Sequence, residues 1–525
     1  MKPFHKIAII LLLGATVIAG CKKSFLDRPS TSQISSDNFY KSPSDLRLAT
    51  ANLYGGAPWW QWLQPWLLFG DALPGTAFYT YYGDLMQLYT RTITAQNGLV
   101  STGWTGLYNV VAQCNMVIND INQQAPASIP ALTKNQAIAE ARFIRAVAYY
   151  NLVVYWGAVP IIEDNTKLIN NPLVNRNTVP DVYKFITRDL TFASQYLPLA
   201  DQPGRVTRWS AQGMLGKVYL TMAGWGQSGS RDQSLLDSAK KYSGNVCKNS
   251  GLALFASYYD LFKVQNNDNP ESLFALQWAP GVGYGFGNVL PVYYSPSSKL
   301  VAQGSGGWQP LQPTYDLYQM YSAKDTVRRK ATIMLTGDYY PELDIADGGY
   351  KATGISMKKH IIGNEKDNNS PTMTLWSSPE HNAILRLADV YLVYAEAILG
   401  NNATTSDADA LLYFNKVRKR AGVDPVTVLN ADVILQERRV ELAFEGQYWA
   451  DLVRLSYYQP AKAVNILNNQ KRYTFTYDPV TRTAKRDTTT AVPTLPATIS
   501  AFTLQIPAAE VTTDPKLALP PVPYY

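Results

Sequence analysis

The stretch AIAEARFIRAVAYYNLVVYW, residues 137–156, indicates the fold class of this chain. Its small and apolar residues recur at steps of three and four, which gathers them on one face of an α-helix. They are Ala137, Ala141, Ile144, Ala148, Leu152 and Tyr155. The spacing extends back to Thr133, so we expect one helix of about six turns over residues 133–156. Because this face is rich in alanine, a neighbouring helix can approach it closely.

Similar patterns on both sides predict further helices. The sequence SPSD at residues 42–45 combines capping side chains with an acidic residue near the positive end of the helix dipole, so a helix should begin there. Other helices are expected over residues 104–123, 180–197, 208–223, 232–249, 383–399, 407–421 and 431–447. Helices of this length, paired through short turns, are typical of stacked helical hairpins such as tetratricopeptide-type (TPR) repeats.

Long irregular stretches separate these helices, at residues 265–310, 335–380 and 465–500. The first contains an expected strand, ESLFALQW at 271–278, followed by a loop rich in glycine and tyrosine. Loops of this length inside a compact domain usually carry a function. The predicted fold is mainly α, a TPR-like helical-hairpin scaffold with long irregular loops and a few short strands, and we expect binding on the loops.

Composition argues against nucleic acid as a partner. The 525 residues include 47 Lys and Arg against 40 Asp and Glu, and only 17% are charged, compared with roughly 25% in typical soluble domains. The one dense basic run is RRK at 328–330. A nucleic-acid-binding surface would need a larger concentration of positive charge.

The first twenty residues have the features of an export signal. Basic residues precede an apolar run over 7–19, which is long enough for a signal peptide and too short to cross a bilayer. The run ends in Ile-Ala-Gly directly before Cys21, which resembles the bacterial lipobox. This favours a lipid on Cys21 over an ordinary signal peptide with a cysteine nearby. No later segment offers 18 consecutive apolar residues, so we expect membrane attachment through the lipid alone.

The expected domain organisation follows from this leader. It comprises a signal peptide over 1–20, a lipid-anchored tether over 21–38, and one domain over 39–525 whose N-terminal helical half is about 39–260 and whose C-terminal half is about 261–525.

Neither a metal ion nor a cofactor is expected. Beyond the leader and the lipidation site Cys21, two cysteines and two histidines remain, Cys114, Cys247, His360 and His381, and no cysteine stands at ligand spacing from a histidine. Phosphate-loop and dinucleotide-binding motifs are absent from the sequence.

Several motifs, in matching order and spacing over nearly the whole mature chain, resemble the SusD/RagB family of outer-membrane nutrient-uptake lipoproteins of Bacteroidetes. They are FLDRP at 25–29, AEARFIRA at 139–146 continued by YWGAVP at 155–160, GRVT at 204–207, RLADVYL at 386–392, NKVR at 415–418, ERRVELAFEG at 437–446 and DLVR at 451–454. Each motif alone is weak, but together and in register they are specific.

The resemblance implies a non-catalytic protein that captures an oligosaccharide or polysaccharide and delivers it to a SusC-like TonB-dependent outer-membrane transporter. It also implies a location at the outer membrane, lipid-anchored at the cell-surface face. The cargo is left open, because a lid that passes a peptide or another non-sugar nutrient to the transporter would carry the same motifs.

Glycan recognition favours exposed aromatic rings, which stack on the C–H faces of sugars, beside polar groups that bond the hydroxyls. Two clusters in segments rich in glycine and proline have this composition, which favours exposure because core residues usually lie on periodic elements. The expected contact residues are Trp59, Trp60, Trp62, Asp71, Tyr79, Tyr81 and Tyr82 in the first cluster, and Tyr284, Tyr293, Tyr294 and Trp308 in the second. Any single tryptophan is more often buried than exposed, but each cluster should supply at least one residue that contacts the glycan.

The main catalytic alternative is a surface glycoside hydrolase using Glu437, Glu441 and Glu445. These residues lie on one face of a predicted helix, roughly 6 Å apart, a spacing that a retaining hydrolase tolerates. Catalytic carboxylates, however, must approach the sugar from opposite sides, and the nearby arginines would lower pKa values that a general acid needs raised. We therefore expect structural ion pairs here and no catalytic residue.

Overall fold

The structure is a computed structural model that describes residues 39–79, 83–282, 285–304, 306–367, 372–489, 492 and 494–525, with only the backbone described at Tyr79. The predicted signal peptide, the lipidation site Cys21 and the tether over 21–38 lie outside the described residues. In the described part of the chain, no helix combines the length and the apolar character that crossing a membrane requires.

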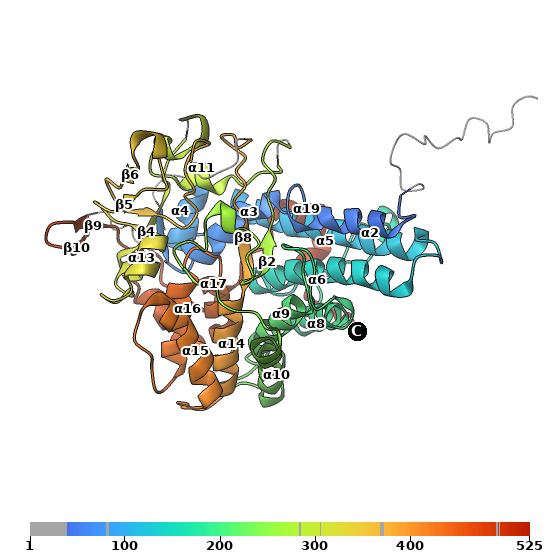
Figure 1. The fold of residues 1–525 in the computed structure, drawn as a ribbon. Helices are drawn as coiled ribbons and strands as arrows, with labels where there is room; N and C mark the ends of the chain where they lie inside the picture. The colour runs from blue at the N-terminus through green and yellow to red at the C-terminus, as the bar shows by residue number, and fades with distance from the viewer. Residues whose placement is uncertain are drawn as a thin grey trace, which may run out of the picture.

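Helices dominate the fold (Figure 1). Those of the N-terminal half are α2 (Pro43–Ala51), α3 (Trp60–Leu67), α4 (Gly83–Thr90), α5 (Gly98–Gln124), α6 (Ala131–Trp156), α7 (Lys167–Asn170), α8 (Val179–Tyr196), α9 (Arg208–Met222) and α10 (Gln233–Asn249). Those of the C-terminal half are α11 (Leu290–Tyr294), α12 (Tyr315–Tyr318), α13 (Thr326–Thr332), α14 (Leu387–Leu399), α15 (Ala408–Ala421), α16 (Ala431–Glu441), α17 (Tyr448–Ser456), α18 (Pro460–Asn468) and α19 (Ala508–Thr513).

The longer helices pack in a connected series, in which α5, α6, α8, α9, α10, α14 and α15 each contact the next. This arrangement confirms the predicted helical-hairpin scaffold. The alanine-rich helix α6 lies between α5 and α8, as its small residues allow. Buried Arg145 on α6 fixes the three helices together, because its guanidinium donates to Asp189 on α8 at 2.8 and 3.0 Å and to Asn115 on α5 at 2.7 Å.

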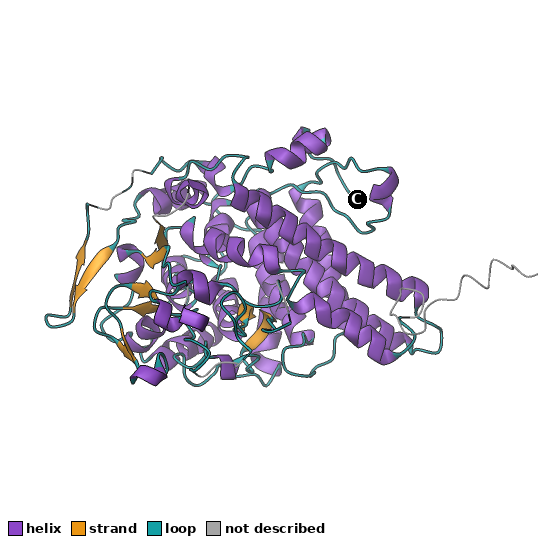
Figure 2. Cartoon of the chain, turned by 90° about the horizontal axis from the view of Figure 1, so that it is seen from above, coloured by secondary structure: helices purple, strands orange, loops and turns teal. Residues whose placement is uncertain are grey.

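Short strands lie mostly at one end of the helical stack (Figure 2). In the described residues they form two-stranded antiparallel sheets, in which β1 pairs with β3, β2 with β8, β4 with β7, β5 with β6 and β9 with β10. The strands are β1 (Ala77–Tyr79), β2 (Ser272–Leu276), β3 (Leu311–Pro313), β4 (Ile333–Met334), β5 (Tyr339–Tyr340), β6 (Tyr350–Lys351), β7 (Ser356–Met357), β8 (Asn382–Arg386), β9 (Phe475–Asp478) and β10 (Thr483–Arg486).

Three predicted helices begin or end differently. The helix expected over 104–123 begins six residues earlier, at Gly98. The helix expected from residue 383 begins at Leu387, because residues 382–386 form β8 and pair with the correctly predicted strand β2. The helix expected over 431–447 stops at Glu441. The reason is Asp71, whose buried carboxylate accepts the backbone N–H groups of Phe444 at 2.9 Å and Gly446 at 3.0 Å and holds residues 442–447 in a turn.

Candidate functional site

The first predicted aromatic cluster is largely part of the core. Trp59 and Trp62 are completely buried, so the expectation that they contact a glycan is wrong. Pro58 and Pro65, which suggested an exposed loop, instead stand just before and inside helix α3. Helix α3 is buried because α5 presents glycines to it: a Cβ at Gly106 would lie 2.8 Å from the Trp62 backbone nitrogen.

Asp71 is also not a ligand-binding residue in this structure. Its side chain is completely buried, and its two oxygens are occupied by the backbone N–H groups of the turn after α16. Burial raises the pKa of this carboxyl to about 7, although the two N–H donors offset part of the effect. Its role is to shape that turn.

Trp60 alone of the predicted N-terminal tryptophans reaches the surface, half-buried at the start of α3. The backbone of Tyr79 ends strand β1 and pairs with Leu311 of β3. The structure does not describe the side chain of Tyr79, so its glycan contact stays a prediction. Tyr81, Tyr82 and Tyr284 lie outside the described residues, so their predicted contacts stay predictions.

The second cluster forms an exposed group of rings. Tyr293 on α11 and Trp308 have ring centroids 5.5 Å apart, and each lies 5.4 Å from the ring of Trp376. Trp308 is 46% exposed and Trp376 40%, while Tyr293 is half-buried beneath them. We call Tyr293, Trp308 and Trp376 the aromatic triad. Tyr294 points the other way into the core at 3% exposure, so its predicted glycan contact is wrong.

Backbone geometry holds Trp308 in this position. The two glycines before it have φ angles of 98° and 77°, in the left-handed region that other residues avoid. A Cβ at Gly307 would lie 2.6 Å from the carbonyl carbon of Ser297, so no side chain fits there. This dipeptide turns the chain so that the ring of Trp308 comes to lie beside that of Tyr293 on α11.

Trp376 stands in a tight turn. Thr374 and Ser377 exchange backbone hydrogen bonds of 3.0 and 3.1 Å, which leaves Trp376 between them at the tip. The next residue, Ser378, pairs through its backbone with Asn288. The Asn288 side chain then accepts the N–H of Leu290 at the first turn of α11, at 2.9 Å. One buried asparagine therefore joins the turn of Trp376 to the helix of Tyr293.

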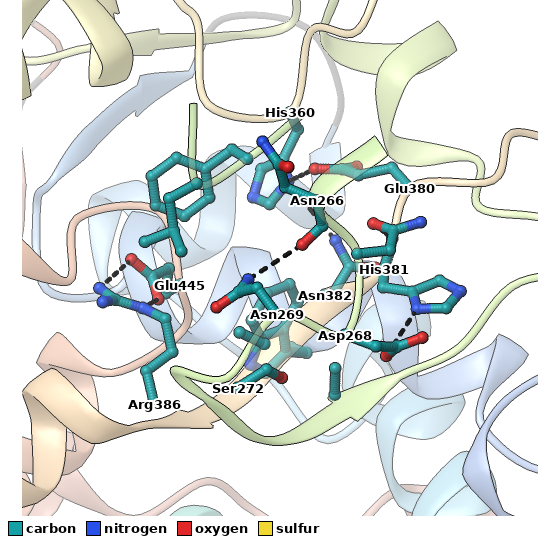
Figure 3. Close-up of a pocket in the computed structure, with 16 residues that line it drawn as sticks. Asn266, Asp268, Asn269, Ser272, His360, Glu380, His381, Asn382, Arg386 and Glu445 are labelled. Atoms are coloured by element: carbon teal, nitrogen blue, oxygen red, sulfur yellow. Dashed lines mark hydrogen bonds and ion pairs between the residues drawn. The ribbon is translucent and has the colours of Figure 1, made fainter. Parts of the chain in front are cut away.

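Buried polar side chains, of which Figure 3 shows His360 and Glu380, support Asn288. The Asn288 amide donates to the Glu380 carboxylate at 2.9 Å, and Glu380 also lies 2.7 Å from His360 Nδ1. The other ring nitrogen of His360 faces the Phe444 carbonyl at 2.8 Å. Burial would lower the pKa of His360, but Glu380 and the Phe444 carbonyl outweigh burial and raise the pKa.

The cavity in Figure 3 is too small for a sugar. It is lined by polar residues that include Asn266, Asp268 and His381, yet its volume is only about 30 Å³. Sites for small molecules usually measure roughly 300–1,000 Å³. The buried side chains of Glu380 and His360 therefore support the aromatic triad through Asn288.

A larger pocket opens beside the triad. It measures about 290 Å³ and is lined by Trp60, Gln61, Gln64, Thr102, Val289, Tyr293 and Trp376. Exposed ring faces beside uncharged amides and hydroxyls can stack on C–H groups and bond hydroxyl groups. The predicted residues Trp60 and Tyr293, from opposite halves of the chain, thus meet in this pocket, and Trp308 contacts Tyr293 beside it.

Trp376 was missed by the sequence reasoning. It is an isolated tryptophan in the polar, turn-rich stretch 335–380, without the aromatic neighbours that drew attention to the other clusters. A large aromatic residue in a segment of turn-forming residues was the available signal.

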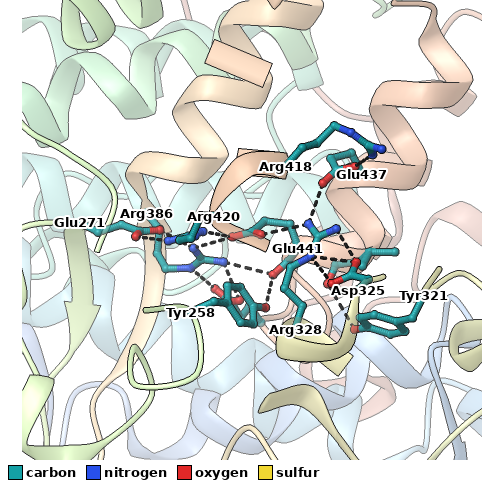
Figure 4. A network of polar contacts seen from close by, with 12 residues as sticks. Tyr258, Glu271, Tyr321, Asp325, Arg328, Arg386, Arg418, Arg420, Glu437 and Glu441 are labelled. Atoms are coloured by element: carbon teal, nitrogen blue, oxygen red, sulfur yellow. Dashed lines mark hydrogen bonds and ion pairs between the residues drawn. The ribbon is translucent and has the colours of Figure 1, made fainter. Parts of the chain in front are cut away.

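The acidic residues of the catalytic alternative form buried ion pairs, as predicted (Figure 4). Glu437 lies 2.6 Å from both Arg328 and Arg418, and Glu445 lies 2.6 Å from Arg386. Glu441 contacts Arg328, Arg386 and Arg420.

Neighbouring positive charges favour the ionised form of Glu441 and Glu445. Burial would raise the pKa of Glu441, but Arg420, Arg386 and Arg328 outweigh it and lower the pKa. Arg386 and Lys359 likewise outweigh burial and lower the pKa of Glu445. A general acid needs the opposite shift. The arginines that sequence proximity suggested as partners bind elsewhere: Arg438 to Asp389 and Asp451, Arg439 to Asp316, and Arg454 to Glu396.

Comparisons with known proteins agree with the fold and the motifs. Residues 340–525 match the model of the SusD family, and residues 25–220 match a family described as "Starch-binding associating with outer membrane". A SusD-like protein of Bacteroides ovatus is 40% identical over 467 residues, which cover 88% of this chain and 85% of the relative.

Solved structures give the same result. A crystal structure with xylogluco-oligosaccharide is 38% identical, has a TM-score of 0.85, and is matched over 91% of this chain and 99% of that chain. A laminarin-binding SusD-like protein has a TM-score of 0.69 over 93% of this chain and 100% of that chain, but at 23% identity it supports the fold alone. The extent of the similarity to the Bacteroides ovatus protein shows that this chain belongs to the SusD family.

Proposed function

We propose that this chain is a non-catalytic, glycan-binding lipoprotein of the outer membrane. It is attached through Cys21, captures an oligosaccharide or polysaccharide, and delivers it to a SusC-like TonB-dependent transporter. The observation that carries the proposal is the aromatic triad, in which two exposed tryptophans and a tyrosine from separate segments form one group of rings.

The chemistry of the triad suits a sugar. The ring centroids of Trp308 and Trp376 lie 5.4 Å apart with 33° between the ring planes, so the two rings offer one apolar surface on which a sugar can stack. Trp60 and the amides of Gln61 and Gln64 line the pocket next to it. The relative whose crystal structure contains xylogluco-oligosaccharide makes a β-glucan the first ligand to test.

Absence of catalysis is supported by the state of the acidic residues. Glu437, Glu441 and Glu445 are buried and each contacts at least one arginine. The described residues that line the triad and its pocket include no carboxylate. A hydrolase would need two carboxyl groups on opposite sides of the bound sugar.

Calorimetric titration of the soluble chain, without its leader and lipid, tests the ligand and the site. Xyloglucan oligosaccharides, laminarin and a peptide library serve as probes. We expect binding to a glycan, a tenfold or greater loss of affinity in Trp308→Ala and in Trp376→Ala, and no product release. Trp225→Ala is the matched control, since Trp225 is 37% exposed and packs on Tyr457, away from the triad. Unchanged affinity in a variant that combines Trp308→Ala with Trp376→Ala contradicts the site, and binding of peptides alone contradicts a glycan as the ligand.

Fractionation of cells tests attachment and partner. Cys21→Ser should move the protein from the outer-membrane fraction to the soluble fraction, because the lipid anchor is lost. The wild-type chain should co-purify with a barrel transporter from solubilised membranes. An unchanged distribution of Cys21→Ser would refute the lipid anchor.

A further inference from the structure

We propose that the pocket beside the aromatic triad binds a single neutral sugar branch, so that the protein selects a branched β-glucan over an unbranched one. This inference rests on the proposed function, since it concerns the same ligand.

The pocket and the triad share two residues. Tyr293 and Trp376 belong to the triad and also line the pocket, to which helix α3 contributes Trp60, Gln61 and Gln64. A ligand that lies against the exposed rings therefore passes the pocket mouth. Whatever enters the pocket has to be joined to that ligand or compete with it.

The volume limits what can enter. About 290 Å³ is far more than the roughly 10–15 Å³ needed to hold one water, yet it lies at the lower end of sites that hold a whole small-molecule ligand. The pocket thus has room for one or two sugar rings and not for an oligosaccharide chain.

The lining selects an uncharged, hydroxyl-rich group. None of the residues around the pocket carries a charge, which disfavours uronic acids and sulfated sugars, whose charge would be desolvated without a partner. Gln61 and Gln64 lie three residues apart on the same face of α3. Neither amide has a hydrogen-bond partner among the described residues, so each offers a free donor and a free acceptor. Trp60 and Val289 supply apolar surface for the C–H groups of a ring.

Shape favours a branch over the end of a straight chain. An extended chain lying across Trp308 and Trp376 continues along the surface and leaves the pocket empty. A ring attached to the side of that chain leaves it at an angle and can reach between α3 and α11. Filling the pocket buries additional apolar area and satisfies the two amides, so the branched ligand gains affinity that the linear one lacks.

Titration with three probes tests the inference: a β-1,4-linked glucotetraose with single xylose branches, the unbranched cellotetraose, and laminarihexaose as a curved unbranched chain. We expect the wild type to bind the branched probe at least tenfold more tightly than either other probe. Gln61→Ala combined with Gln64→Ala should reduce this preference to threefold or less, because the branched probe loses more affinity than cellotetraose does. Gln436→Ala, on an exposed position of α16, is the matched control.

The outcomes separate the two proposals. Trp308→Ala should weaken the branched and unbranched probes alike, which identifies the triad as the shared surface. Equal wild-type affinity for branched and unbranched probes, a preference that survives in the double glutamine variant, or equally tight binding of laminarihexaose would each overturn the branch pocket and leave glycan binding intact. Failure of all three probes to bind overturns the branch pocket, and the proposed function falls with it only if the wider glycan screen also finds no ligand.

Discussion

Asn288 and Ser378 pair through both of their backbone groups, with the Asn288 N–H 2.9 Å from the Ser378 oxygen and the Ser378 N–H 3.0 Å from the Asn288 oxygen. Asn288 lies two residues before helix α11, which carries Tyr293, and Ser378 lies two residues after Trp376. The pair therefore sets the distance between two rings of the triad that are 83 positions apart in the sequence.

Gly287→Ala should disturb this pair. A Cβ at Gly287 would lie 2.0 Å from Ser377 Oγ and 2.3 Å from its Cα, so the two segments must separate. We expect a loss of about 1–3 kcal/mol in the free energy of unfolding, as for other overpacked sites, and a tenfold or greater loss of glycan affinity in the protein that remains folded. Denaturant unfolding and calorimetric titration measure the two effects.

Gly354→Ala is the control for this change, since nothing lies within 4 Å of its Cβ position. Its stability and affinity should match those of the wild type. Glycan affinity that is unaffected by Gly287→Ala would mean that the backbone pair does not position the triad.

Trp62→Ala and Trp376→Ala should separate stability from binding. Trp62 is completely buried against Phe69 and Tyr155, so its removal should cost about 3–5 kcal/mol of stability, while the folded fraction still binds. Trp376 is 40% exposed, so its removal should cost far less stability and most of the glycan affinity. Thermal unfolding measures the stability of both variants, and calorimetric titration measures their glycan affinity. A Trp62→Ala protein that is fully stable but does not bind would reverse our assignment.

Local periodicity was sufficient to place most helices. The helix expected over 208–223 is observed as Arg208–Met222, and the one expected over 232–249 as Gln233–Asn249. The errors arose where a distant segment decides the backbone conformation. Residues 382–386 form a strand because β2, more than a hundred positions earlier, pairs with them, and the turn after α16 depends on Asp71.

The sequence predicts the types of residue that form the site, but only in part which individual residues reach it. A tryptophan preceded by two glycines, as at Trp308, is held out from the regular elements, and sequence alone could indicate that. Burial of Trp62 depends on Gly103 and Gly106 of another helix, which the local sequence around residue 62 does not reveal. Trp376 joins the triad because its turn pairs with Asn288, which lies 88 positions earlier in the sequence.

Glu441→Gln should destabilise the fold. Glu441 is completely buried and contacts Arg328 and Arg386 at 3.2 Å each, as well as Arg420, so the substitution leaves buried positive charge with less compensation. We expect a loss of roughly 3–5 kcal/mol, measured by denaturant unfolding. Asp424→Asn removes an exposed partner of Lys324 and should change stability by less than about 1 kcal/mol. An unaltered unfolding midpoint in Glu441→Gln would show that the buried network does not stabilise the protein.

Stability should fall in acid partly because of Glu396. Burial opposes ionisation of this carboxylate, but Arg454 and Arg231, the latter at 2.8 Å, outweigh burial and lower its pKa from 4.5 to about 2. Because the unfolded chain binds a proton at higher pH than the native one, the stabilisation is complete above about pH 4.5 and is lost as the pH falls towards 2. The loss is on the order of 3 kcal/mol for this group.

Glu396→Gln should be less stable at pH 7, because Arg231 and Arg454 lose a counter-charge, yet its free energy of unfolding should decline less steeply between pH 4.5 and 2. Denaturant titrations across this range give both slopes, and parallel slopes for the two proteins would assign the acid sensitivity to other carboxylates.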